Sequence, residues 1–133
     1  MVILLGASGY IGQSFVEALR ARQWPFTPLA RKDVDYTDSD TLWRFLRDTR
    51  PEFVINAAGF TGKPNVDACE TAPADTLLGN TLLPQTLAEI CAATSTPWGA
   101  CAEPPRAGDT CSLSRRPTTW RCRAFETLDI AQT

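Results

Sequence analysis

Hydrophobic residues along the first part of the chain alternate between short continuous runs and helical repeats. Residues 2–5 form a continuous apolar run that ends at Gly6, which is typical of a strand buried on both faces. Apolar side chains then recur at Ile11, Phe15 and Leu19, and this spacing predicts an amphipathic helix. The chain therefore begins with a buried strand, a glycine-containing turn and a helix.

The alternation continues through the next stretch. Residues 26–30 predict a second strand, which Pro28 weakens because proline cannot donate to a sheet ladder. Residues 37–40 supply the N-cap of a second helix, with Asp38 or Ser39 as the capping residue. The apolar face of that helix consists of Leu42, Phe45 and Leu46.

A third apolar run at residues 53–55 precedes a third helix. Its helical repeat consists of Leu83, Leu87, Ile90 and Cys91. Pro84 predicts a kink or a restart within it. The order β-α-β-α-β-α predicts an α/β fold, a Rossmann-like parallel sheet with flanking helices. We expect the sheet to be truncated after about three to four strands, since after the third run only residues 98–102 could begin another.

Composition narrows the chemistry. The chain has no histidine, which excludes catalytic triads built on histidine and zinc sites that need an imidazole, and we expect no metal site. The net charge of −2 argues against nucleic acid as a partner. Five cysteines without a Cys-x-x-Cys pair suit a reducing cytoplasm, and no apolar run approaches the ~20 residues of a membrane span. We expect a cytoplasmic protein without membrane contact.

The turn after the first strand carries glycines at every third position. Gly6 permits a tight turn, Gly9 lets a pyrophosphate approach the backbone, and Gly12 lets helix and strand pack closely. The free amides of the following helix N-terminus favour phosphate. The alternative is an ordinary turn, because glycines serve those too. The candidate cofactor-binding residues of this turn are Gly6, Ser8, Gly9, Tyr10, Ile11 and Gly12.

The pattern Gly-x-x-Gly-x-x-Gly resembles the extended branch of the short-chain dehydrogenase/reductase superfamily, which contains nucleotide-sugar epimerases, dehydratases and reductases. Asn56-Ala57-Ala58-Gly59 resembles that superfamily's Asn-Ala-Ala-Gly element, which lies against the cofactor adenosine. The small side chains of Ala57, Ala58 and Gly59 leave space for a flat ligand, or alternatively serve helix packing. Residues 61–70 and 80–84 resemble dTDP-4-dehydrorhamnose reductases and the related rhamnose synthase epimerase/reductases, so the likeness covers about residues 1–98.

The resemblance implies NADP or NAD as cofactor. Arg31 follows the second strand, where an arginine can pair with the 2′-phosphate of NADP, so NADP is favoured over NAD unless Arg31 only solvates the strand end. Asp35 and Tyr36 are cofactor-site candidates by the same resemblance, since Asp35, with Tyr36 beside it, matches the acidic position that contacts the adenine amino group in the family. The alternative for Asp35 is a helix-capping role.

Three further residues receive roles from the resemblance. Thr61 and Lys63 are candidates for the side of the site that meets a nucleotide-sugar substrate, although a loop lysine is often only solvated. Asn80 is a cofactor-site candidate that fixes the local backbone in the manner of the family, or else caps the helix that restarts before Pro84.

The family transfers hydride with a tyrosine four residues before a lysine, because the ammonium lowers the phenol pKa from about 10. The only tyrosines here are Tyr10 and Tyr36, and neither has a lysine four residues later. No catalytic residue is therefore assigned. The chain is interpreted as the NAD(P)-binding portion of a nucleotide-sugar oxidoreductase that acts on a 4-keto sugar, or alternatively as a non-catalytic dinucleotide-binding module or an inactive fragment.

Residues 98–133 lack sustained periodicity and contain three of the five cysteines. We expect residues 1–97 to form an NAD(P)-binding Rossmann half-fold and residues 98–133 to be a non-homologous, irregular tail, for which a frameshifted or mispredicted end is one explanation. In such a half-fold the first or third strand would lack a neighbour. We therefore expect self-association through an unpaired sheet edge.

Overall fold

The computed structural model describes residues 1–62, 67–100 and 120–121, and within them the strands form one parallel sheet. The strand order is β2-β1-β3-β4-β5. The strands are β1 (Val2–Leu5), β2 (Phe26–Leu29), β3 (Phe53–Asn56), β4 (Trp98–Ala100) and β5 (Trp120–Arg121). The α/β class and the parallel sheet expected from the sequence are confirmed.

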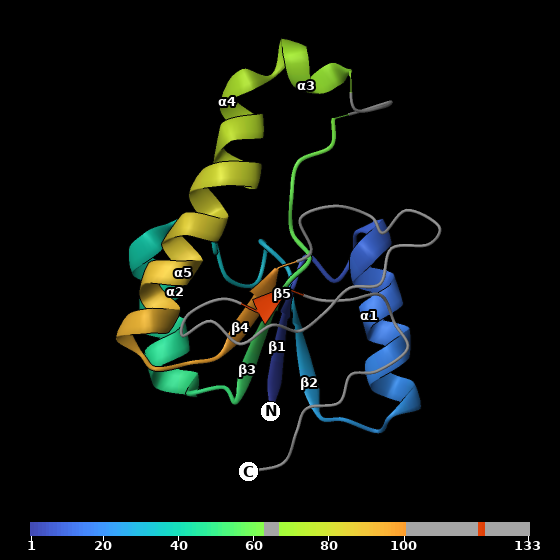
Figure 1. Cartoon of the computed structure of the whole chain (residues 1–133), viewed down its shortest axis with the longest axis vertical. Helices are drawn as coiled ribbons and strands as arrows, with labels where there is room; N and C mark the ends of the chain where they lie inside the picture. The colour runs from blue at the N-terminus through green and yellow to red at the C-terminus, as the bar shows by residue number, and fades with distance from the viewer. Residues whose placement is uncertain (63–66, 101–119, 122–133) are drawn as a thin grey trace.

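Helices cover both faces of the sheet (Figure 1). The helical elements are α1 (Tyr10–Ala21), α2 (Ser39–Thr49), α3 (Ala68–Thr71), α4 (Pro73–Leu77), the π-helical turn η1 (Leu78–Leu82) and α5 (Leu83–Ala93). Figure 1 shows α1 on one face and α2 with α5 on the other, while α3 and α4 extend beyond the carboxyl ends of the strands. Among the described helices, none has the length and apolar character needed to cross a membrane.

The continuous apolar run of β1 is explained by two cores, one on each face of the sheet. On the α2 and α5 side, Ile3 and Leu5 pack in a cluster with helix residues that include Leu42, Leu46 and Leu87. On the α1 side, Val2 and Leu4 pack in a cluster with helix residues that include Phe15, Val16 and Leu19. Successive strand residues face opposite sides, so a central strand must be apolar at every position.

The sheet edges differ from the sequence expectation. β1 pairs with β2 and β3, and β3 pairs with β1 and β4, so the expectation that the first or third strand lacks a neighbour is wrong. Among the described residues the edges are β2 and β5. Pro28 fits in β2 because an edge strand leaves one row of backbone groups outside the ladder. Self-association through an edge stays a prediction.

The last two strands come from the region where the sequence pattern changes. β4 begins at Trp98 as expected and ends at Ala100, while positions 101 and 102 lie outside the described residues. β5 pairs with β4 in parallel and was not expected, because two residues carry no readable periodicity. The sheet thus has five strands instead of three to four. The domain boundary between residues 97 and 98 stays a prediction.

Two helix starts that the sequence predicts are confirmed by the structure. The Asp38 side chain accepts a hydrogen bond from the Thr41 amide at 2.8 Å, which makes Asp38 the N-cap of α2. Pro84 lies in the first turn of α5, immediately after η1, so the helix restarts there as the sequence predicted.

Candidate functional site

The strand order reverses at β1, because β2 lies on one side of it and β3 on the other. The chain leaves β1 toward α1 and β2 on one side, then returns to β3 on the other. In open parallel sheets, ligands bind outside the carboxyl ends of the strands at such a reversal. The β1 loop begins at Gly6 and the β3 loop begins at Ala57, and both lie at the carboxyl ends of their strands.

Two glycines of the β1 turn are required by the fold itself. Gly6 has φ +73°, and a Cβ atom there would lie 2.5 Å from the backbone nitrogen of Ala58. A Cβ atom on Gly12 would lie 2.1 Å from the carbonyl oxygen of Gly6. Both distances are too short for a real side chain, so Gly6 seats the β1 turn against the β3 loop and Gly12 seats α1 against the turn.

Gly9 differs from its two neighbours. It is the N-cap of α1, with φ −77° and ψ 167°, angles that any residue adopts. A Cβ atom there would meet only the Gly6 carbonyl oxygen, at an ordinary contact distance of 3.4 Å. Neither backbone conformation nor packing within the described residues therefore explains a glycine at position 9.

Hydrogen bonds hold the β1 turn in one conformation. The Gly9 amide donates to the Gly6 carbonyl (3.0 Å), and the Gln13 amide donates to the Gly9 carbonyl (2.9 Å). The Gln13 side-chain Nε2 donates to the Ala7 carbonyl at 2.6 Å. Sequence reasoning missed Gln13, because an exposed helical glutamine carries no pattern that distinguishes it.

The other candidates of this turn take different positions. Ser8 is exposed, and Tyr10 is 89% exposed at the first position of α1. Ile11 packs against the core on the α1 side. Helix N-terminal amides have no intrahelical acceptor, so the exposed start of α1 offers donors and a partial positive charge to an anion.

The β3 loop is tied to the β1 strand and to itself. The Ala57 amide donates to the Leu5 carbonyl at 3.0 Å, and the buried Asn56 side chain accepts from the Ala58 amide at 3.0 Å. Ala57 packs on the α1-side core, and Ala58 packs on the opposite core. Asn56 is thus the residue that shapes the loop carrying Ala57, Ala58 and the exposed Gly59.

Asn80 clamps the next part of this loop from the π-helical turn. Its Oδ1 accepts from the Phe60 amide (2.7 Å) and its Nδ2 donates to the Phe60 carbonyl (2.8 Å). The α5 helix has no side-chain cap bond, so Asn80 fixes the backbone instead of capping the helix. Thr61 follows the clamped residue and is exposed, whereas Lys63 lies outside the described residues.

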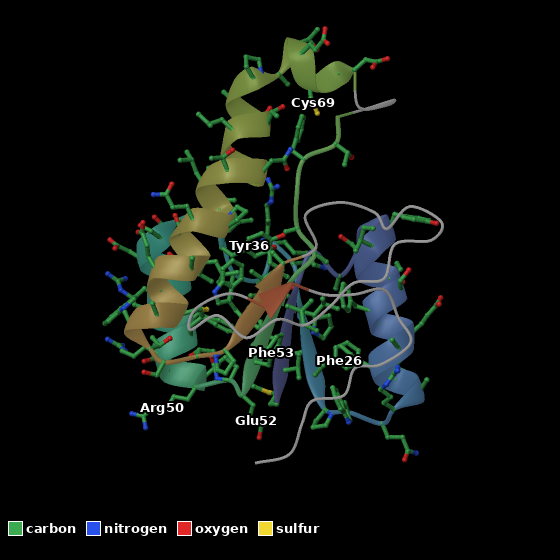
Figure 2. The ribbon with its side chains drawn as sticks, in the orientation of Figure 1. Phe26, Tyr36, Arg50, Glu52, Phe53 and Cys69 are labelled. Atoms are coloured by element: carbon green, nitrogen blue, oxygen red, sulfur yellow. The ribbon has the colours of Figure 1, made fainter. Side chains whose placement is uncertain are left out.

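The end of β2 carries the remaining candidates. The Arg31 guanidinium lies over the Tyr36 ring, 6.0 Å from its centroid. Tyr36 is only 5% exposed and belongs to the core on the α2 and α5 side, near the upper end of the sheet in Figure 2. The Tyr36 ring therefore contacts Arg31 while packing in the core, and this packing role is not predicted by the sequence.

Asp35 is exposed beside them. Its Oδ1 accepts from the Thr37 amide (3.1 Å) and from the Thr37 hydroxyl (2.5 Å). These bonds lower the pKa of Asp35 below its usual 3.8, so the side chain is an anion at neutral pH. Since Asp38 caps α2, Asp35 is not needed for capping.

The structure brings most candidates to the carboxyl ends of the central strands. β2 and β3 flank β1, with Leu29 and Asn56 both in register with Leu5, so the segments that follow all three strands start side by side. Arg50 and Glu52 lie at the opposite end of the sheet (Figure 2). The described residues contain no group of three cysteine or acidic side chains that could hold a metal ion.

Comparison with known proteins identifies relatives of this chain. A bifunctional dTDP-4-dehydrorhamnose 3,5-epimerase/dTDP-4-dehydrorhamnose reductase of Arabidopsis thaliana is 32% identical over 89 residues, which are 67% of this chain and 29% of that protein. A dTDP-4-dehydrorhamnose reductase of Streptomyces griseus is 33% identical over 91 residues, covering 68% of this chain and 29% of that protein. The chain spans less than a third of the length of these curated relatives.

Solved structures show the same fold. A Bacillus anthracis dTDP-4-dehydrorhamnose reductase in complex with NADP matches with a TM-score of 0.64 and 21% identity, over 74% of this chain and 34% of that one. The family model described as RmlD substrate binding domain matches residues 1–98 of this chain. The chain therefore belongs to the RmlD substrate-binding-domain family.

Proposed function

We propose that this chain binds a nicotinamide dinucleotide at the carboxyl ends of β2, β1 and β3, as the cofactor-binding portion of a nucleotide-sugar reductase. The single observation that carries the proposal is Gly9, which has neither a left-handed backbone nor a close neighbour to explain it. A ligand that approaches the backbone at this point accounts for the missing side chain.

The pyrophosphate fits the start of α1. The exposed amides there and the residues Ser8, Gly9 and Tyr10 form its surroundings, while Gly6 and Gly12 keep the turn close to the sheet. The adenosine would lie against Ala57, Ala58 and Gly59, with Asp35 accepting from its amino group. Fold neighbours solved with NADP, from Bacillus anthracis, and with NAD, from Thermus thermophilus, support this class of ligand.

NADP is the preferred form in this proposal. The Arg31 guanidinium is exposed at the end of β2 and is held over the Tyr36 ring, where it can pair with a 2′-phosphate. NADPH should therefore bind about tenfold or more tightly than NADH, as expected for one charge-assisted contact.

The test is a fluorescence titration of the purified chain with NADPH and with NADH. Arg31→Glu should weaken NADPH binding to the level of NADH, whereas Arg44→Glu, the same charge change on the exposed surface of α2, should leave the preference intact. Failure of the wild-type chain to bind either nucleotide would overturn the proposed function. Equal binding of both by the wild-type chain would overturn the role of Arg31 alone.

The reaction of the parent enzyme is proposed as hydride transfer to a 4-keto sugar nucleotide, which would meet the nicotinamide near Thr61 and Lys63. The 133 residues contain no tyrosine four positions before a lysine. This favours a second candidate for the chain itself, a module that binds dinucleotide without transferring hydride. Binding of NADPH without its oxidation in the presence of a 4-keto sugar nucleotide supports the second candidate, and turnover contradicts it.

A cytoplasmic location is part of the proposal.

A further inference from the structure

Gln13 holds two carbonyl groups of the β1 turn at once. Its backbone amide donates to the Gly9 carbonyl at 2.9 Å, and its side-chain Nε2 donates to the Ala7 carbonyl at 2.6 Å. The Gln13 side chain is exposed and belongs to neither core, so the contribution that the structure shows for it is the hydrogen bond to the Ala7 carbonyl.

The bond to Ala7 fixes the direction of a second group. The carbonyl of Ala7 and the amide of Ser8 belong to one planar trans peptide, in which the C=O and N–H bonds point in opposite directions. While the Ala7 oxygen points toward Gln13, the Ser8 N–H must point away from it. The Gly6 carbonyl is held in the same manner by the Gly9 amide at 3.0 Å, so neither peptide is free to turn over.

The orientation matters for an anion. A carbonyl oxygen carries partial negative charge and repels a phosphate, whereas an amide hydrogen attracts it. A rotation of the Ala7–Ser8 peptide would exchange these two groups. Ser8 is exposed next to the start of α1, so its amide can join the donors of the helix N-terminus.

We propose that Gln13 is a positioning residue of the dinucleotide site, whose side-chain amide holds the Ala7–Ser8 peptide so that the Ser8 N–H faces the pyrophosphate. This role rests on the proposed function. Gln13 itself does not touch the ligand.

The test uses Gln13→Met, a neutral side chain of similar length without a donor. Gln85→Met is the matched control, because Gln85 is also an exposed helical glutamine whose Nε2 donates a hydrogen bond, to Glu89 at 3.2 Å. Each protein is titrated with NADP⁺ and with adenosine 2′-monophosphate, which lacks the pyrophosphate. The Ser8 amide resonance is followed by two-dimensional NMR.

Gln13→Met should weaken NADP⁺ binding about tenfold, as expected for one misplaced donor to a charged group, and should leave binding of adenosine 2′-monophosphate unchanged. In the wild-type chain the Ser8 amide should shift on addition of NADP⁺. Equal loss of both ligands in Gln13→Met, or no loss of either, overturns the proposal. A Ser8 amide that does not respond to bound NADP⁺ in the wild-type chain overturns it without any variant. Failure of the wild-type chain to bind NADP⁺ counts against the proposed function itself.

Discussion

At the residue scale, three non-glycine positions among the described residues have left-handed backbone angles. They are Gln23 (φ 55°), Arg50 (φ 43°) and Ser95 (φ 53°). Arg50 ends α2, where its amide donates to the Leu46 carbonyl at 2.9 Å. Glycine is the usual residue at such a position because it has no Cβ atom to strain the backbone.

Arg50→Gly should therefore raise the free energy of unfolding by about 1 kcal/mol. Arg44→Gly, in the middle of the same helix, should lower it by about 1 kcal/mol, because glycine there only adds flexibility to the unfolded chain. Chemical denaturation of both variants and the wild-type chain measures the difference. Destabilisation by Arg50→Gly would show that the Arg50 side chain contributes more than its backbone angle costs.

Sequence reasoning located residues better than it assigned their roles. The three glycines are predicted to have three separate functions. The left-handed φ of Gly6 agrees with its predicted turn, and the close contact at Gly12 agrees with its predicted packing role. Tyr36 stays a cofactor-site prediction, and the burial of its ring in the core is a role that the sequence does not predict. A sequence shows that a tyrosine follows an aspartate, but its burial depends on α2 and α5, which pack there only in the folded chain.

At the scale of elements, the π-helical turn η1 links α4 to α5 and docks on the β3 loop. Gly79 is buried, and a Cβ atom there would lie 3.0 Å from the Phe60 Cβ. Asn80 then pairs with both backbone groups of Phe60. Such π-helical insertions are rare and frequently lie at functional sites. Here the insertion brings two consecutive residues onto one loop segment.

Asn80→Leu should lower the free energy of unfolding by roughly 1 to 2 kcal/mol, since two hydrogen bonds are lost and the Phe60 amide is left without its acceptor. Hydrogen exchange at the Phe60 amide should accelerate at least tenfold, while exchange at the Val54 amide in β3 should change only with global stability. Asn80→Asp keeps the acceptor and loses the donor. Its unfolding free energy and its exchange rate at the Phe60 amide should lie between those of the wild-type chain and Asn80→Leu. Unchanged protection of Phe60 in Asn80→Leu would contradict the clamp.

Element prediction succeeded where a periodic pattern coincides with packing and failed where the element is too short for one. The repeat through Leu87 and Ile90 was readable because one face of α5 is buried. The two residues of β5 have no such signal, since a two-residue strand is set by its pairing with β4 alone. The same limit applies to η1, which no residue pattern predicts.

At the scale of the whole molecule, the two faces of the sheet provide stability, and the carboxyl ends of its strands provide the candidate site. The cores lie on either side of β1 and β3, and the candidate residues lie where β2, β1 and β3 end. A substitution at the carboxyl ends of the strands can therefore affect binding without affecting folding, provided that the residue makes no close contact within the fold. Gly9 meets this condition and Gly12 does not.

The most direct test of a pyrophosphate position at Gly9 compares Gly9→Ala with Gly12→Ala. Gly9→Ala should keep the free energy of unfolding within about 1 kcal/mol of the wild-type value, because an alanine adopts its backbone angles without strain. The same variant should bind NADPH at least tenfold more weakly, because the methyl group occupies the approach of the pyrophosphate. Gly12→Ala should instead lose on the order of 3 kcal/mol of stability by overpacking.

The measurement is NADPH affinity plotted against unfolding free energy for the three proteins. Gly9→Ala should separate the two quantities, with weak NADPH binding in a stable fold. Wild-type affinity for NADPH in Gly9→Ala would contradict a pyrophosphate that approaches the backbone at Gly9. A loss of stability as large as that of Gly12→Ala would show that the fold itself requires the glycine at position 9.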